Sequence, residues 1–343
     1  MVSRIIVPLD QSYIAECALP YARSLAKLTS APLQLLVVID APAWLPSESE
    51  SRESATFGQP FDEVGRPVSA SMPFGLYPGS ADVDESEFNE LQEREAEANE
   101  YLSYVSNSIS DVAVETHVRY GDPAQRILQL AATDADAARD EEPVIVMATH
   151  GRSGLGRVLL GSVALKIAEQ SPCPMFLIRA LRQKPDTAAS VDFERVLVAL
   201  DGSEFSEAVL PHVEQIFGTS GAKLHLLRSV ESERSWLTGE HDARPSDGRT
   251  ERDESEEYLS AMADQLGIRG YTVTWDVPEG DPADRINEIA ESADVDLIAL
   301  ATHGRSGLTR IAVGSVAEEV LHKAPRPLML VRPEAARASE PAE

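Results

Sequence analysis

Short uninterrupted runs of Val, Ile and Leu recur along this chain, separated by longer stretches in which apolar residues return at helical spacing. The runs at 144–147 (Val-Ile-Val-Met) and 297–300 (Leu-Ile-Ala-Leu) lack the polar alternation of a half-exposed strand. A strand that is covered on both faces needs this composition. Strands of this kind that alternate with helices predict an α/β fold, in which a parallel sheet carries helices on both sides.

In the first half of the chain the pattern alternates strand and helix throughout. The expected elements are strands at 4–9, 33–39, 112–119, 143–148 and 174–179, and helices at 12–28, 89–108, 123–133 and 162–170. We expect the same series to return between residues 195 and 331.

The second half repeats the first in sequence as well as in pattern. Arg4-Ile-Ile-Val-Pro-Leu-Asp10 is echoed by Arg195-Val-Leu-Val-Ala-Leu-Asp201, and Thr149-His-Gly-Arg-Ser-Gly-Leu155 returns unchanged at 302–308. Gly-Asp-Pro-Ala at 121–124 and Gly-Ser-Val-Ala at 161–164 also recur, at 280–283 and 314–317. One duplicated domain therefore predicts two units, at 1–181 and 194–333, with a linker at 182–193 and a flexible tail at 334–343.

A polar segment at about 41–88 lengthens the first copy. It is rich in Ser, Glu, Pro and Gly and has no apolar period, so we expect a surface loop inserted into the first domain. Its counterpart, at about 231–250, is also polar. Loops of this kind often carry partner-specific function.

Composition narrows the range of partners. With 343 residues, 43% of them hydrophobic and 25% charged, the chain suits two globular domains. It contains no apolar run long enough for a membrane helix and leaves no room for a signal peptide before its first strand, which predicts a cytoplasmic protein. The net charge of -27 repels nucleic acid and anionic membranes, so a phosphate ligand would have to be held by local groups. Cys17 and Cys173 are isolated and are interpreted as buried thiols, not metal ligands.

Two polar pairs stand where the first strand of each copy ends, the position at which open parallel sheets bind ligands. They are Asp10 with Ser12 and, in the repeat, Asp201 with Ser203. Asp and Ser at such a turn are also what caps a helix, so a cap and a ligand contact both remain open. The Gly-Asp-Pro turns, in contrast, are explained by an N-cap that is followed by proline.

The loop after the fourth strand is the more specific candidate. Gly151 and Gly161 flank a long turn, and Ser162 opens the next helix. Glycine lets backbone amides approach a phosphate closely, and the N-terminus of a helix favours anions. Each feature alone can be a plain loop glycine or an N-cap, but the same arrangement recurs in the second copy.

This spacing resembles the signature of the universal stress protein family, G-x2-G-x9-G-[ST], in the class of that family that binds ATP. The resemblance covers nearly the whole chain, twice. It implies two tandem doubly wound, Rossmann-like domains of the adenine nucleotide alpha hydrolase type, each with a five-stranded, mainly parallel sheet of order 3-2-1-4-5. Alanine replaces the first signature glycine, at Ala148 and Ala301, which narrows backbone freedom where phosphates would approach.

The resemblance also implies roles for individual residues. It places Asp10 and Val38 near adenosine and Gly151, Gly161 and Ser162 around the phosphates of ATP, ADP or AMP, with Mg²⁺ carried by those phosphates. Val38 corresponds to Ser229 in the second copy, with Val230 its apolar neighbour. The full set expected to bind nucleotide is Pro8, Leu9, Asp10, Ser12, Val38, Met147, Ala148, His150, Gly151, Arg152, Gly161, Ser162, Val163 and Ala164 in the first copy, and Ala199, Leu200, Asp201, Ser203, Ser229, Val230, Ala301, His303, Gly304, Arg305, Gly314, Ser315, Val316 and Ala317 in the second.

Three functions fit these features. The first is a stress-response sensor or signalling module that binds adenine nucleotide. The second is a slow Mg²⁺-dependent ATPase, which the sequence disfavours because it lacks a P-loop lysine, paired metal-binding acids and an evident general base; no catalytic residue and no protein metal ligand is predicted. The third is an interaction scaffold with one or both sites empty. A nicotinamide dehydrogenase is excluded, because the loop after Leu9 lacks G-x-G-x-x-G.

The family resemblance carries one expectation about assembly. The last strands of two domains commonly pair in this family, and duplication would place that pairing within one chain, with residues 175–178 against 328–331. A homodimer of chains is expected in addition.

Overall fold

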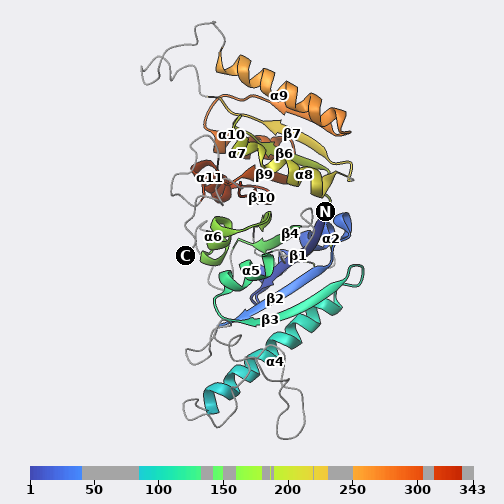
Figure 1. Cartoon of the computed structure of the whole chain (residues 1–343), viewed down its shortest axis with the longest axis vertical. Coiled ribbons are helices and arrows are strands. Elements are labelled where there is room, and N and C mark those ends of the chain that lie inside the picture. The colour runs from blue at the N-terminus through green and yellow to red at the C-terminus, as the bar shows by residue number, and fades with distance from the viewer. Residues whose placement is uncertain are drawn as a thin grey trace.

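A computed structural model describes residues 1–40, 85–132, 142–149, 160–179, 186, 189–218, 220–230, 250–303 and 313–333. Within these residues, one ten-stranded sheet runs through the molecule, with helices on both of its faces (Figure 1). The α/β class that the apolar pattern predicts is therefore confirmed.

The first half forms one end of this sheet. Its elements are β1 (Val2–Leu9), α1 (Tyr13–Glu16), α2 (Leu19–Thr29), β2 (Leu33–Ile39), α4 (Glu85–Asn107), β3 (Val114–Tyr120), α5 (Pro123–Ala131), β4 (Glu142–Ala148), α6 (Ser162–Gln170) and β5 (Met175–Ile178). The strands lie in the order β3-β2-β1-β4-β5, and each neighbouring pair is parallel. The expected order 3-2-1-4-5 is confirmed.

The second half builds the other end in the same way. Its elements are β6 (Arg195–Ala199), α7 (Glu204–Glu207), α8 (Val209–Phe217), β7 (Lys223–Leu227), α9 (Glu251–Ile268), β8 (Thr272–Asp276), α10 (Pro282–Ser292), β9 (Leu297–Ala301), α11 (Ser315–Lys323) and β10 (Leu328–Val331). The strands continue the sheet as β10-β9-β6-β7-β8. The equivalent strands of the two halves therefore follow one another in opposite order along the sheet.

The two halves meet where β5 pairs with β10, the one antiparallel pair among the described strands. Leu177 lies opposite Leu328, and Phe176 opposite Met329. Phe193, just before β6, packs between Phe176 and Phe217, with ring centroids 6.3 and 5.6 Å away. The end of the expected linker is therefore part of the core.

Buried apolar side chains fill both spaces between the sheet and its helices. On one face the sheet packs against α2, α4, α8 and α9, and on the other against α5, α6, α10 and α11. This double cover explains why the strands are apolar without alternation. Cys17 and Cys173 are buried, as expected. Among the described residues, no helix has the length and apolar composition that crossing a membrane requires.

Two expectations about local structure are wrong. The helix expected at 12–28 is interrupted between α1 and α2, and Pro20 lies in the first turn of α2. Proline has no N–H group to continue the bonding of a preceding helix, so the chain starts a new one. Of the insertion expected at 41–88, only 85–88 are described, and these residues begin α4 instead of ending a loop. The expected tail at 334–343 lies outside the described residues.

Candidate functional site

A pocket of about 340 Å³ lies at the carboxyl ends of β6, β7 and β9. The chain leaves β6 toward one edge of the half-sheet and β9 toward the other, and open parallel sheets bind ligands at this point of reversal. Its lining residues are Ala199, Leu200, Asp201, Ser206, Leu227, Ser229, Val230, Glu251, Gly280, Pro282, Ile286, Leu300, Ala301, Thr302, His303, Gly314, Ser315, Val316 and Ala317. Apolar side chains from strands and α10 therefore line one part, and polar groups from loops and helix starts the rest.

The acidic loop after β6 is held by its own hydrogen bonds. The Asp201 carboxylate accepts from the Ser203 backbone N–H at 2.9 Å and from the Ser203 hydroxyl at 2.6 Å. Ser203 Oγ in turn accepts from the Ser206 N–H at 3.2 Å and caps α7. Ser203 is thus a helix cap and does not line the pocket, whereas Asp201 lines it and also orients the cap.

The first copy builds the same turn. Asp10 accepts from the Ser12 backbone N–H and hydroxyl at 3.1 and 2.5 Å, and Ser12 Oγ accepts from the Ala15 N–H at 3.2 Å. The cap interpretation, which the sequence left open, is therefore correct for both serines. It does not compete with a ligand contact at the aspartates.

Gly314 stands where the loop after β9 enters α11. Its N–H donates to the Thr302 carbonyl at 2.6 Å, and a Cβ at this position would lie 2.7 Å from the same oxygen. Its φ of -62° is open to any residue. Glycine is therefore needed here for close backbone approach, and not for a special conformation.

The start of α11 opens into the pocket. Gly314 is its N-cap and supplies no side-chain acceptor, while Ser315, Val316 and Ala317 all line the pocket. The first N–H groups of a helix lack partners within the helix and carry its positive dipole end. This part of the pocket is therefore suited to an anion. In the first copy, α6 begins in the same way, after Gly161.

The structure brings together most of the second-copy residues that the sequence predicts. Those that line the pocket are Ala199, Leu200, Asp201, Ser229, Val230, Ala301, His303, Gly314, Ser315, Val316 and Ala317. Gly304 and Arg305 lie outside the described residues.

The first-copy candidates gather at the matching edge. Pro8 and Leu9 end β1, with Asp10 and Ser12 just beyond; Val38 is in β2; Met147 and Ala148 end β4; and Gly161, Ser162, Val163 and Ala164 lie at the start of α6. His150, Gly151 and Arg152 lie outside the described residues.

Sequence reasoning missed part of the lining, namely Ser206, Leu227, Glu251, Gly280, Pro282, Ile286, Leu300 and Thr302. The repeated Gly-Asp-Pro turn was a usable signal for Gly280 and Pro282, because it follows the third strand of each copy at the same sheet edge. Glu251 carried no such signal, since it follows a polar segment that the repeat does not preserve.

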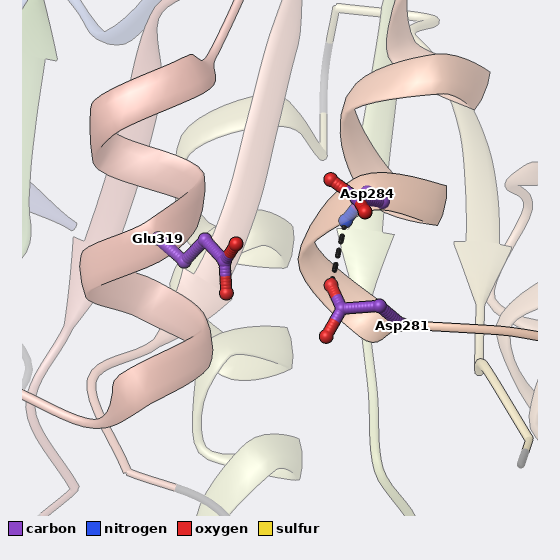
Figure 2. A group of neighbouring side chains, drawn as sticks. All are labelled: Asp281, Asp284 and Glu319. Atoms are coloured by element: carbon purple, nitrogen blue, oxygen red, sulfur yellow. Dashed lines mark hydrogen bonds between the residues drawn. The ribbon is translucent and has the colours of Figure 1, made fainter.

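Asp281, Asp284 and Glu319 form an acidic group on the helix pair α10–α11, where their carboxylates could reach a common ion (Figure 2). However, the Lys323 ammonium donates to Asp284 and to Glu319, at 2.8 Å in each case. This contact lowers the pKa of Asp284 and raises the pKa of Lys323. Asp281 caps α10 by accepting from the Asp284 N–H at 3.0 Å. The cluster therefore joins two helices through a lysine.

In the first copy, a lysine at a non-equivalent position joins the corresponding helices α5 and α6. Lys166 of α6 donates to Asp122, the N-cap of α5, at 3.1 Å. Both Gly-Asp-Pro turns thus have the capping role that the sequence predicts.

Comparison with known proteins shows the same duplication of one domain. A family model described as the universal stress protein family matches residues 66–179 and again 192–332. A universal stress protein of Mycolicibacterium smegmatis is 26% identical over 335 residues, which cover 96% of this chain and 97% of that protein. A universal stress protein of Methanocaldococcus jannaschii is 31% identical over 149 residues, covering 41% of this chain and 82% of that protein.

Solved structures agree on the fold. The structure of a universal stress protein from Archaeoglobus fulgidus superposes with a TM-score of 0.61 at 19% identity, covering 96% of both chains. A universal stress protein structure from Pseudomonas aeruginosa has a TM-score of 0.57 at 17% identity and covers 98% of this chain.

Proposed function

The chain belongs to the universal stress protein family, and from this premise we propose that it binds ATP or a related adenine nucleotide and acts as a stress-response sensor or signalling module. One site is the pocket at the carboxyl ends of β6, β7 and β9, and the other is the matching edge of the first half. Each of the two domains, at 1–181 and 194–333, would then hold one nucleotide.

The observation that carries this proposal is the start of α11, which presents its first backbone amides to an otherwise largely apolar pocket. A ligand that fills this space needs an anionic group at one end and a flat apolar body at the other, and a nucleotide has both. Leu227, Ile286 and Leu300 supply the apolar surface. Ser315 adds a hydroxyl donor beside the amides.

Binding, and not turnover, is the activity that this arrangement supports. The pocket carboxylates are Asp201 and Glu251, and Asp201 is engaged with the cap of α7. Mg²⁺ would be carried by the phosphates themselves. We assign no catalytic residue, and a colorimetric assay for released phosphate on the samples of the titration described below tests for turnover.

The test is calorimetric titration of ATP with Mg²⁺ into the wild-type chain and into Ser315→Asp. Ser315 is exposed at the first position of α11, where an acidic side chain is compatible with the helix dipole. The variant should therefore stay folded while its carboxylate repels the phosphates. We expect one of two sites to weaken by more than about tenfold, the effect of about 1.4 kcal/mol.

Ser315→Asn is the matched control, because it has the same shape without the charge. Ser162→Asp makes the same test in the first copy, and the double variant should lose both sites. Wild-type protein that is folded but gives no saturable heat with ATP would refute the proposal. Steady release of phosphate at a useful rate would make the protein an enzyme instead of a sensor.

We also propose a homodimer of chains. Pairing of β5 with β10 uses the last strand of each half within one chain, which leaves β3 and β8 as the edges of the sheet. Edge strands offer unpaired backbone groups to a second copy. Light scattering after size-exclusion chromatography should give twice the chain mass of 37.2 kDa.

A further inference from the structure

Glu251 is the first residue of α9 and lines the pocket. The segment that leads to α9 leaves β7, whereas α11 follows β9, and β6 stands between these two strands in the sheet. Glu251 and the amides of α11 therefore approach the pocket from opposite sides. The amides of α11 favour an anion, and Glu251 adds a second carboxylate to a pocket that Asp201 also lines.

Several contacts hold the first turn of α9 in this place. The Thr250 hydroxyl accepts from the Asp253 N–H at 3.1 Å, while the Asp253 carboxylate accepts from the Thr250 N–H at 2.8 Å, which completes a capping box. Arg252 reaches Glu279, 3.6 Å away, just before the Gly280 turn. The position of Glu251 is thus built into the fold.

Further along α9, Tyr258 is fixed from two sides. Its hydroxyl donates to Glu207 of α7 at 2.9 Å, and the Arg228 guanidinium lies 5.3 Å from the centre of its ring. α9 is thereby joined to the element that carries the Asp201 loop.

Two equivalent contacts align α9 with α4 of the first copy. The Tyr101 hydroxyl donates to Glu16 at 3.3 Å, as Tyr258 does to Glu207. Glu95 interacts with Tyr120, the residue before Gly121. Arg252 and Glu279 make the corresponding pair before Gly280.

This alignment places Arg94, which is half-buried, at the position of Glu251. The two copies therefore carry opposite charges at one equivalent position. Resting on the nucleotide sites proposed above, we infer that this position selects the ligand at each site. Glu251 makes the second site reject a nucleotide with an added phosphate on its ribose, and Arg94 makes the first site accept it.

The chemistry follows from charge and hydrogen bonding. A carboxylate accepts hydrogen bonds from the hydroxyls of an unmodified ribose and repels a phosphate in their place. A guanidinium donates to phosphate oxygens, frequently through two bonds at once. The second site is thus specific for plain 5′-nucleotides, and the first for nucleotides that carry a further anionic group.

The experiment labels the full chain with 8-azido-ATP under light and measures the label separately in peptides from each half. AMP and adenosine 3′,5′-bisphosphate, which differ by a single phosphate, serve as competitors. In the wild type, the bisphosphate should protect the second half roughly tenfold less well than AMP does, and the first half at least as well as AMP. Glu251→Gln should bring the ratio in the second half close to one, and Arg94→Gln should weaken protection of the first half by the bisphosphate.

Glu254→Gln is the matched control, because it removes the same charge from an exposed position of the same helix that does not line the pocket. It should leave both ratios unchanged. An unchanged ratio in Glu251→Gln, with labelling that ATP still competes away, would overturn this inference alone. Labelling that ATP does not compete away in either half would overturn the proposed nucleotide sites as well.

Discussion

At the scale of single residues, Gly314 shows that a glycine of the proposed phosphate site has a structural reason of its own. A methyl group there would stand 2.7 Å from the Thr302 carbonyl oxygen, and this oxygen belongs to backbone that cannot rotate away. We expect Gly314→Ala to lower the free energy of unfolding by about 1–3 kcal/mol. Urea unfolding followed by circular dichroism measures it.

Gly267 provides the opposite control. It lies in α9 with open space around it, so alanine adds no clash and restricts the unfolded chain. Gly267→Ala should raise the same free energy by about 0.5–1 kcal/mol. If both substitutions destabilise equally, close approach at Gly314 is not the reason for glycine there.

Two half-buried histidines predict how stability depends on pH. Burial is the main cause that lowers the pKa of His117 and of His225 below the ordinary value of 6.5, and Arg119 lowers that of His117 further. The unfolded chain then binds more protons than the folded one, so stability is present above pH 6.5 and is lost as pH falls below it.

The measurement is the unfolding temperature at about pH 7.5 and about pH 5.5, on either side of the histidine range. It should fall on acidification in the wild type and fall less in His117→Gln/His225→Gln. An equal fall in both proteins would assign the effect to other groups.

Individual site residues were predicted where the repeat preserves them or where the family resemblance assigns them. Asp201, Ser315 and His303 recur in both copies and all three line the pocket. Glu251 was missed because its counterpart is Arg94, so repetition could not mark it. The repeated Glu-Tyr-Leu-Ser at 100–103 and 257–260 aligns the two helices in the same register as the three-dimensional contacts, and it was the available signal for this pair.

At the scale of elements, a hydrogen bond from a tyrosine hydroxyl holds α9 against α7, and an equivalent bond holds α4 against α1. Tyr258→Phe removes the hydroxyl that donates to Glu207 but keeps the ring beside Arg228. We expect the free energy of unfolding to fall by about 1.5–3 kcal/mol, the range for a hydrogen bond to a charged group. Hydrogen exchange should speed up mainly in α9.

Tyr101→Phe is the comparison within the same chain. Its hydroxyl lies 3.3 Å from Glu16, a longer contact, so the loss should be smaller and confined to α4. Faster exchange spread evenly over the whole sheet in either variant would argue against a local tether.

The positions of the strands and of the helices between them were predictable from the apolar pattern, because a strand that is buried on both faces must consist almost entirely of apolar residues. β2 at Leu33–Ile39 and α6 at Ser162–Gln170 have the predicted bounds. The break between α1 and α2 was harder, because Pro20 is equally compatible with a kink and with a new first turn.

At the scale of the whole molecule, Phe193 connects the halves beside the β5–β10 seam. It touches Tyr21 and Phe176 of the first half and Phe217 of the second. Phe193→Ala should cost about 3–5 kcal/mol, as for other buried aromatic residues. Calorimetry should then resolve two transitions where the wild type shows one.

Phe205→Ala is a control from the same half, because Phe205 is only half-buried and lies in the short helix α7. It should leave the number of transitions unchanged. A single transition in Phe193→Ala would show that the seam alone couples the halves.

At the scale of the whole molecule, the duplication was predictable from the repeated segments, and the strand order from the resemblance to the universal stress protein family. The lysine contacts that join each helix pair could not be predicted from the repeat, because Lys166 and Lys323 occupy different positions of equivalent helices. Charge partners can move along a surface helix while the buried face stays the same.

The antiparallel seam has a consequence for how the protein meets other molecules. Strands within each half run in one direction, and that direction reverses between Phe176 and Met329. Among the described strands, β3 and β8 are equivalent strands of the two copies, and they form the two ends of one sheet. A partner that pairs with the edge of β3 would therefore find an equivalent edge at β8, so one chain offers the same kind of strand edge twice.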